Sequence, residues 1–221
     1  MNKPVIIFGT GDIAQLAHYY FTHDSDATVA AFTVDQEYLT GNTFCNLPVV
    51  AFEDIHRHYP PDSHQLFIAL SYSRLNGIRK EKYLQAKARG YTLASYVSSR
   101  ATVLNERRIG DNCFILENNT LQPFATIGNN VTLWSGNHIG HHASIQDHCF
   151  IASHVVISGG VVVGDECFIG VNATLRDHIS VGEKSVIGAG ALVMQNAAPH
   201  SVFIGPATAA AGFPSSRLNK L

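Results

Sequence analysis

The sequence predicts two consecutive units, a small parallel α/β domain and a solenoid of short stacked β-strands. The second unit is indicated by a strict repeat: Val, Leu or Ile occupies every sixth position from Val103 to Val193 without a gap. The first unit is indicated by short apolar runs that alternate with helical segments before residue 100, the pattern of a parallel sheet covered by helices.

The elements of the first unit follow from local patterns. Apolar runs bounded by glycine or polar residues predict strands, and segments of helical character lie between them. Gly90 lies where a glycine commonly ends a helix. The expected strands are Val5–Phe8, Val29–Val34, Leu47–Phe52, Gln65–Leu70 and Leu93–Val97, and the expected helices are residues 15–21 and 78–89.

A module of six residues fits neither the spacing of a helix nor the alternation of a sandwich strand. It indicates a short strand followed by a turn, with one large apolar residue pointing inward and a small residue two positions earlier. Three modules form a triangular coil of eighteen residues, so residues eighteen apart lie above one another at a spacing of about 4.8 Å. Cys113, Cys149 and Cys167 therefore share one inward column, where we interpret them as small apolar filler.

A glycine-rich turn follows the first expected strand. Gly9-x-Gly11-x-x-Ala14 matches the dinucleotide-binding fingerprint in its Ala-ending form, and Asp35 ends the second strand, where a carboxylate can bind a ribose hydroxyl. The same turn also suits the tight corner of any α/β domain. The domain is too short for two nucleotide-binding halves, which argues against NAD-dependent redox chemistry.

Composition and charge exclude some classes of binding partner. A formal net charge of −2 provides no basic field for nucleic acid. There is no signal-peptide layout and no apolar run of membrane-spanning length, and the cysteines form no CxxC pair, so we expect a cytoplasmic protein that avoids the membrane. The expected divisions are residues 1–98 for the α/β domain, 99–200 for the solenoid and 201–221 for a C-terminal tail.

Taken together, these features resemble the hexapeptide-repeat sugar acyltransferases, in particular bacterial N-acetyltransferases of nucleotide-linked amino sugars and proteins like the sialic acid O-acetyltransferases. The resemblance rests on the six-residue repeat and on Phe8-Gly9-Thr10-Gly11, Ile78-Arg79-Lys80, Gly90-Tyr91, residues 95–99 and Gly205-Pro206-Ala207. It implies a small Rossmann-like domain followed by a left-handed parallel β-helix. It further implies a homotrimer that binds acetyl-CoA between subunits and needs no metal.

The resemblance also assigns candidate site residues. In the family, a histidine within a segment like Asn137-His138-Ile139-Gly140-His141-His142 is the general base, and the match falls on His141. Gly159 lies eighteen residues later, one coil above, where its N–H can stabilise an oxyanion. His142 is the third expected catalytic residue. Some relatives have a carboxylate at this position, directly after the base histidine. The expected nucleotide-sugar contacts are Gly9, Thr10, Gly11, Asp35, Arg79 and Lys80, and the expected acetyl-CoA contacts are Gly159, His154, Gly188, Pro206 and Ala207.

We therefore expect transfer of an acetyl group from acetyl-CoA to the amino group of a UDP-, dTDP- or GDP-linked sugar, in the biosynthesis of a surface polysaccharide. The alternatives are a sugar O-acetyltransferase, a non-catalytic trimeric scaffold and a γ-type carbonic anhydrase. The sequence leaves open the nucleotide, the sugar stereochemistry, the acylated position, an acyl donor other than acetyl, and the group that orients His141.

Overall fold

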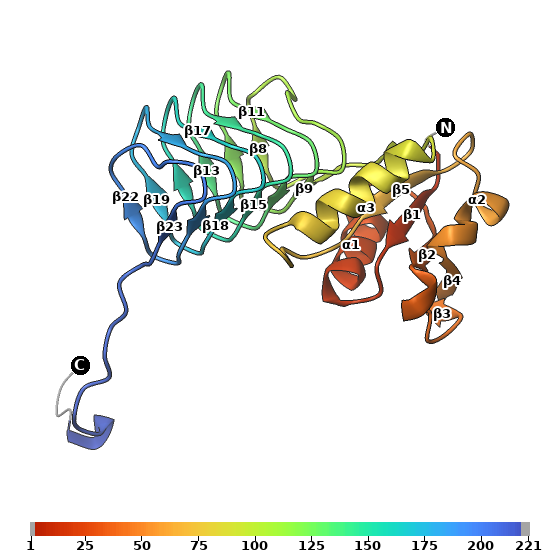
Figure 1. The fold of residues 1–221 in the computed structure, drawn as a ribbon, viewed down its shortest axis with the longest axis horizontal. Helices are drawn as coiled ribbons and strands as arrows, with labels where there is room; N and C mark the ends of the chain where they lie inside the picture. Colours follow the sequence, from red (N-terminus) through yellow and green to blue (C-terminus); the bar gives the residue numbers. More distant parts are fainter. Residues whose placement is uncertain (1–2, 218–221) are drawn as a thin grey trace.

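The computed structural model describes residues 3–217 and contains a six-stranded sheet with helices beside a β-helix (Figure 1). The sheet has the order β3-β4-β2-β1-β5-β6, and all its pairs are parallel except β3 with β4. Its elements are β1 (Val5–Phe8), α1 (Asp12–His23), β2 (Val29–Val34), η1 (Gln36–Tyr38), β3 (Thr43–Phe44), β4 (Leu47–Ala51), η2 (Phe52–Asp54), α2 (Ile55–His58), β5 (Gln65–Ile68), α3 (Gly77–Ala88) and β6 (Thr92–Leu93).

Helices cover both faces of this sheet, because each buried strand directs alternate side chains to opposite sides. Val5 and Ile7 pack with α1, and the same cluster includes Phe114 and Leu116 from the β-helix. Ile6 and Phe8 pack with Tyr83 of α3 and residues of α2. The predicted strands and both predicted helices of this unit are confirmed, apart from the last strand.

The last predicted strand, Leu93–Val97, is wrong as one element. Leu93 belongs to β6 of the α/β sheet, whereas Tyr96 and Val97 form β7, the first strand of the β-helix. The chain passes from one core to the other between them, with Ala94 and Tyr96 buried against the α1 side of the sheet. The six-residue series therefore begins one module before Val103, at Val97.

The β-helix has three faces of parallel strands. The first face contains β7 (Tyr96–Val97), β9 (Phe114–Ile115), β12 (Thr132–Leu133), β15 (Phe150–Ile151), β18 (Phe168–Ile169), β21 (Val186–Ile187) and β23 (Val202–Phe203). The second contains β8 (Thr102–Val103), β10 (Thr120–Leu121), β13 (His138–Ile139), β16 (Val156–Ile157), β19 (Thr174–Leu175) and β22 (Leu192–Val193). The third contains β11 (Thr126–Ile127), β14 (Ser144–Ile145), β17 (Val162–Val163) and β20 (Ser180–Val181).

Strand pairing has the predicted register of eighteen residues, as in Thr120 with His138 and His138 with Val156. The repeated Val, Leu and Ile side chains and the three cysteines of the inward column form one buried core, which confirms the inward-facing interpretation. Near the C-terminal end the register shortens to sixteen, because Ile187 pairs with Phe203. Beyond Phe203 the chain leaves the coil (Figure 1).

The corners of the coil explain why histidines recur. Every sixth residue from Glu106 to Gly190 has a positive φ, the left-handed conformation that glycine, Asn and His adopt more readily than most residues. His142, His148, His154 and His178 all occupy such positions. Their spacing of six therefore reflects the backbone of the corners.

Candidate active site

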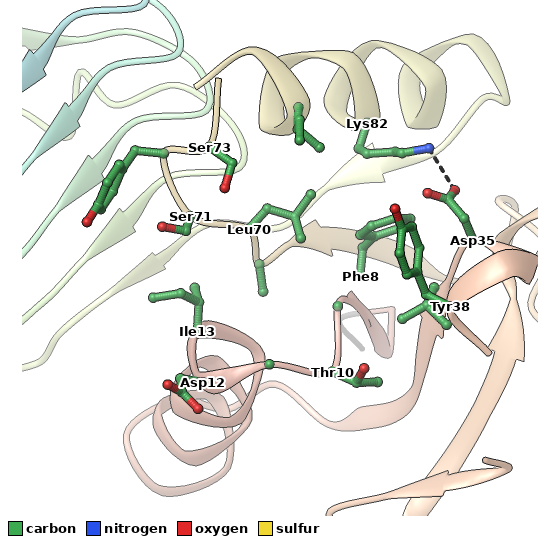
Figure 2. A pocket seen from close by; sticks show the side chains of 16 residues that line it. Phe8, Thr10, Asp12, Ile13, Asp35, Tyr38, Leu70, Ser71, Ser73 and Lys82 are labelled. Carbon is green, nitrogen blue, oxygen red and sulfur yellow. Dashed lines mark hydrogen bonds and ion pairs between the residues drawn. The ribbon is translucent and has the colours of Figure 1, made fainter. Parts of the chain in front are cut away.

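A cavity of about 670 Å³ opens at the carboxyl ends of β1, β2 and β5 (Figure 2). These strands meet where the chain order reverses, since β1 is flanked by β2 on one side and β5 on the other, and ligands of open α/β sheets bind at such a point. The cavity is lined by Phe8, Gly9, Thr10, Gly11, Asp12, Ile13, Val34, Asp35, Tyr38, Ala69, Leu70, Ser71, Tyr72, Ser73, Ile78 and Lys82.

The glycine-rich turn forms the floor of this cavity. Gly9 has φ +118°, and a Cβ there would approach the Ala69 carbonyl oxygen to 3.0 Å, so both the backbone angle and the close approach require glycine. Gly11 caps α1 without a side-chain hydrogen bond. The first-turn N–H groups of α1 have no partner inside the helix, so they are available to a ligand in the cavity. Gly9, Thr10, Gly11 and Asp35 thus lie together, as the sequence predicted.

One end of the cavity carries an ion pair. Lys82 Nζ lies 2.7 Å from Asp35 Oδ1, and both side chains are largely buried (Figure 2). Lys82 is the charged cavity residue of α3 that the sequence analysis missed, as it also missed Tyr38, Ser71, Tyr72 and Ser73. The signal was its spacing, because Ile78 and Lys82 are four residues apart on α3 and both line the cavity.

Arg79 and Lys80, which the sequence analysis expected to contact the nucleotide sugar, do not line this cavity. Arg79 is 1% exposed, and its guanidinium donates to the backbone oxygens of Asn130, His148 and Cys149 in the β-helix. It also donates to the side-chain oxygens of Asn130 and Asn76. The side chain of Lys80 reaches the β-helix as well, with Nζ 2.7 Å from Glu166 Oε1.

These contacts define the docking corner, the turn from the third to the first face that contains Asn130, His148 and Glu166. Burial lowers the pKa of Arg79 to about 10, so at neutral pH the guanidinium stays charged and bound to backbone dipoles. Burial also lowers the pKa of His148, whose Nδ1 lies 2.9 Å from Asn130 Nδ2. One side of α3 is thereby fixed to the β-helix, while its Ile78 and Lys82 face the cavity.

At its other end the cavity meets an apolar groove of about 320 Å³ on the first face of the β-helix. Ile13, Ser71 and Tyr72 line both spaces. The Tyr72 ring packs against Phe150 and Phe168, with centroid distances of 4.9 and 4.8 Å. The cavity and the groove thus form one path from the Asp35–Lys82 pair to the first face.

His141 and Gly159 lie on the turn from the second to the third face, here called the His141 corner. A Cβ at Gly159 would approach His141 Cε1 to 2.6 Å and Nε2 to 2.7 Å, so the imidazole edge lies directly against this glycine. No acceptor within residues 3–217 is paired with the Gly159 N–H, which leaves it available to an oxyanion. The neighbouring ring of His142 brings its Nδ1 to 3.1 Å from Nδ1 of His141.

A histidine against a glycine is not peculiar to this corner. His154 lies against Gly136 and His178 against Gly160, with Nδ1 at 2.5 and 2.3 Å from the position of an added Cβ. The His141 corner differs because His141 precedes the left-handed position and has a second imidazole beside it. The combination of both rings therefore distinguishes the site, and the stacking alone does not.

The remaining expected acetyl-CoA contacts lie elsewhere on the chain. His154 and Gly188 occupy the turn from the first to the second face, the His154 corner, and the second face separates them from His141. Pro206 and Ala207 are exposed beyond β23. The groove on the first face is likewise on the opposite side of the triangular coil from the His141 corner. A single chain therefore does not bring the cavity and His141 together.

Two further observations concern the whole described chain. No helix in residues 3–217 has the length and the apolar character that crossing a membrane requires. Over the same residues, the histidine, cysteine, aspartate and glutamate side chains form no group of three or more that could hold a metal ion.

Comparison with protein families identifies the repeat. Residues 108–139 and 124–159 match the bacterial transferase hexapeptide (six repeats), and residues 160–195 match the hexapeptide repeat of succinyl-transferase. Residues 108–195 therefore consist of hexapeptide repeats. The six-residue spacing, the three faces and the buried column of the coil all agree with this match. No curated protein matches the chain by sequence.

Solved structures share the fold of the whole chain, an N-terminal α/β domain with a left-handed β-helix. A histidine-to-asparagine variant of perosamine N-acetyltransferase from Caulobacter crescentus, in complex with CoA and GDP-perosamine, is 21% identical with a TM-score of 0.82, over 93% of this chain and 95% of that chain. The acetyltransferase domain of PglB from Neisseria gonorrhoeae FA1090, in complex with acetyl coenzyme A, is 19% identical with a TM-score of 0.80, over 91% and 96%. WeeI from Acinetobacter baumannii AYE is 20% identical with a TM-score of 0.78, over 92% and 97%.

Proposed function

We propose that the protein transfers an acetyl group from acetyl-CoA to the amino group of a UDP-, dTDP- or GDP-linked amino sugar. The observation that carries the proposal is the contact between the His141 imidazole and Gly159, whose N–H is unpaired among the described residues. A base beside a free backbone donor is what acyl transfer from a thioester needs. The bound CoA and GDP-perosamine of the relative with the same fold support the choice of both substrates.

The chemistry at His141 follows from the geometry. The amine nitrogen attacks the thioester carbonyl carbon, and His141 Nε2 takes the proton that the nitrogen loses. The Gly159 N–H donates to the oxyanion of the tetrahedral intermediate. When the intermediate collapses, the C–S bond breaks, CoA leaves as a thiolate, and the proton held by His141 is passed to it or to solvent. The products are an amide and CoA.

The cavity in the α/β domain suits the nucleotide part of the acceptor. The Asp35–Lys82 pair at one end offers a carboxylate and an ammonium to the nucleoside, and the uncapped N-terminus of α1 with Thr10, Ser71 and Ser73 offers donors to the diphosphate (Figure 2). The sugar then extends toward the apolar groove beside Tyr72. Gly9, Thr10, Gly11 and Asp35 keep the roles proposed for them.

A second subunit completes the site in this proposal. The groove occupies the first face and His141 the opposite corner, so the acceptor amine reaches the base of a neighbouring chain. We infer a cyclic trimer in which the first face of each chain lies beside the His141 corner of the next. Acetyl-CoA would then lie between the chains, near Gly159 of one and near His154, Gly188, Pro206 and Ala207 of another.

The test is the release of CoA by the purified protein with a panel of UDP-, dTDP- and GDP-linked 4-amino and 3-amino sugars and their hydroxyl analogues. We expect turnover of one amino sugar, and a loss of about 10²–10⁴-fold in kcat in His141→Asn. His200→Asn is the matched control, because His200 is also an exposed histidine at a turn of the coil and lies outside the proposed site. Turnover of hydroxyl acceptors alone would indicate an O-acetyltransferase, and full activity of His141→Asn would exclude His141 as the base.

A further inference from the structure

The two adjacent imidazoles of the His141 corner must share one proton. Nδ1 of His141 lies 3.1 Å from Nδ1 of His142, a hydrogen-bond distance between two nitrogens that are each either donor or acceptor. The Cε1–Nε2 edge of the His141 ring lies against Gly159, with Nδ1 further away. A base at that position needs its lone pair on Nε2, which requires the ring proton of His141 to be on Nδ1. In that state His142 Nδ1 is the acceptor, and the proton of His142 is on Nε2.

The ring of His142 is held in place for this contact. Its backbone has φ +59°, and its ring lies against Phe124 one coil below, with a centroid distance of 4.7 Å. The backbone N–H of His141 donates to Gln122 Oε1 at 2.9 Å, which fixes the other residue of the pair. Both imidazoles therefore have a defined position although they lie on the surface of the single chain.

We propose that His142 is a neutral positioning residue that holds His141 in the tautomer with a free Nε2. The proposal rests on the proposed function of His141 as the base. In place of a negative charge, His142 supplies a lone pair, which selects the tautomer as a carboxylate does but does not stabilise the imidazolium that forms.

The other groups that face the pair add little charge. Gln122 and Phe124, in the coil below, are neutral, and Gly159 and Gly160 lie above. The nearest ionisable side chains along the corner are one coil further on, where His178 packs on Gly160 and Asp177 follows Gly159 by eighteen residues. His142 is thus the one titratable side chain bonded to His141 among the described residues.

Three substitutions that suit a left-handed backbone separate the roles of His142. His142→Asn keeps an acceptor oxygen, and we expect kcat within about threefold of the wild type. His142→Gly removes the acceptor without straining the corner, and we expect kcat to fall by about tenfold or more. His142→Asp adds a negative charge. Because a carboxylate favours the imidazolium form of His141, we expect the acid limb of the pH–rate profile to shift to higher pH by about one unit.

Nitrogen-15 NMR of the histidine rings provides a readout that does not need the acceptor sugar. We expect His141 in the wild type and in His142→Asn to carry its proton on Nδ1, and His142→Gly to show a mixture of tautomers. A wild-type His141 with its proton on Nε2 would overturn the proposal. Equal activity of the His142→Gly and His142→Asn variants would also overturn it. Full activity of His141→Asn would instead refute the proposed function.

Discussion

Replacing Arg79 tests how strongly the α/β domain is fixed to the β-helix. In Arg79→Ala three buried acceptors lose their only donor among the described residues: the backbone oxygens of Asn130 and His148, and Asn76 Oδ1. Cys149 O still accepts from Thr132 N. Each buried acceptor left without a partner costs about 1–3 kcal/mol, and water entering the space recovers part of it. We therefore expect a loss of about 3–5 kcal/mol in the free energy of unfolding.

Thermal and urea unfolding of Arg79→Ala measure this loss, which corresponds to a decrease in Tm of roughly 6–20 °C for a chain of this size. Arg57→Ala is the matched control, because Arg57 forms a surface ion pair with Asp54 at 3.0 Å and is worth at most about 1 kcal/mol. Arg79→Lys should also be destabilised, since an ammonium cannot reproduce the planar fork of donors. A loss in Arg79→Ala no larger than in Arg57→Ala would refute the reasoning.

Two further outcomes follow from the site and from the junction of the domains. In Gly159→Ala the new Cβ would overlap the His141 ring, so we expect kcat to fall by about 10²-fold with little change in Tm; unaltered kinetics would show that the ring moves aside freely. Hydrogen bonds from Ser99 and Tyr96 lower the pKa of Asp24 from an ordinary 3.8 to about 2. Because the folded pKa is depressed, Asp24 stabilises the fold above pH 3.8 and loses this effect as pH falls toward 2. The free energy of unfolding of Asp24→Asn, measured from unfolding curves, should therefore be about 1–2 kcal/mol lower than that of the wild type near neutral pH, and the two should converge in acid. A difference that stays constant with pH would contradict this assignment.

The sequence was most informative where structure repeats. The strict spacing of Val, Leu and Ile predicted the core, the register and the stacking of His141 under Gly159, because a solenoid depends only on neighbouring coils. The Gly9-x-Gly11 fingerprint could also be identified from the sequence, because the backbone conformation at Gly9 requires glycine. Both are short-range requirements, and each appears directly in the residue pattern.

The surroundings of Arg79 and Lys80 could not be predicted, because they depend on contacts between the two units. Arg79 and Lys80 were assigned to the substrate with the family resemblance, whereas their partners in the structure are carbonyl and carboxylate groups 51 to 86 residues away. Asn76, Arg79, Tyr83 and Lys87 form a polar stripe at helical spacing, which a sequence alone presents as a solvated surface. Only the packing of α3 shows that the stripe faces the β-helix and that Lys82 faces the cavity.

The separation of the cavity and His141 on opposite sides of one coil has a genetic consequence. In the proposed trimer, each site takes its cavity from one chain and its base from the next, so a chain with a defective base and a chain with a defective cavity can restore one another. A mixture of His141→Asn and Lys82→Glu chains then contains, in every mixed trimer, one interface that joins an intact cavity to an intact base. Random assembly of equal amounts would give about a quarter of the wild-type sites, although each variant alone is inactive. Two null alleles of this gene would therefore complement each other within one cell.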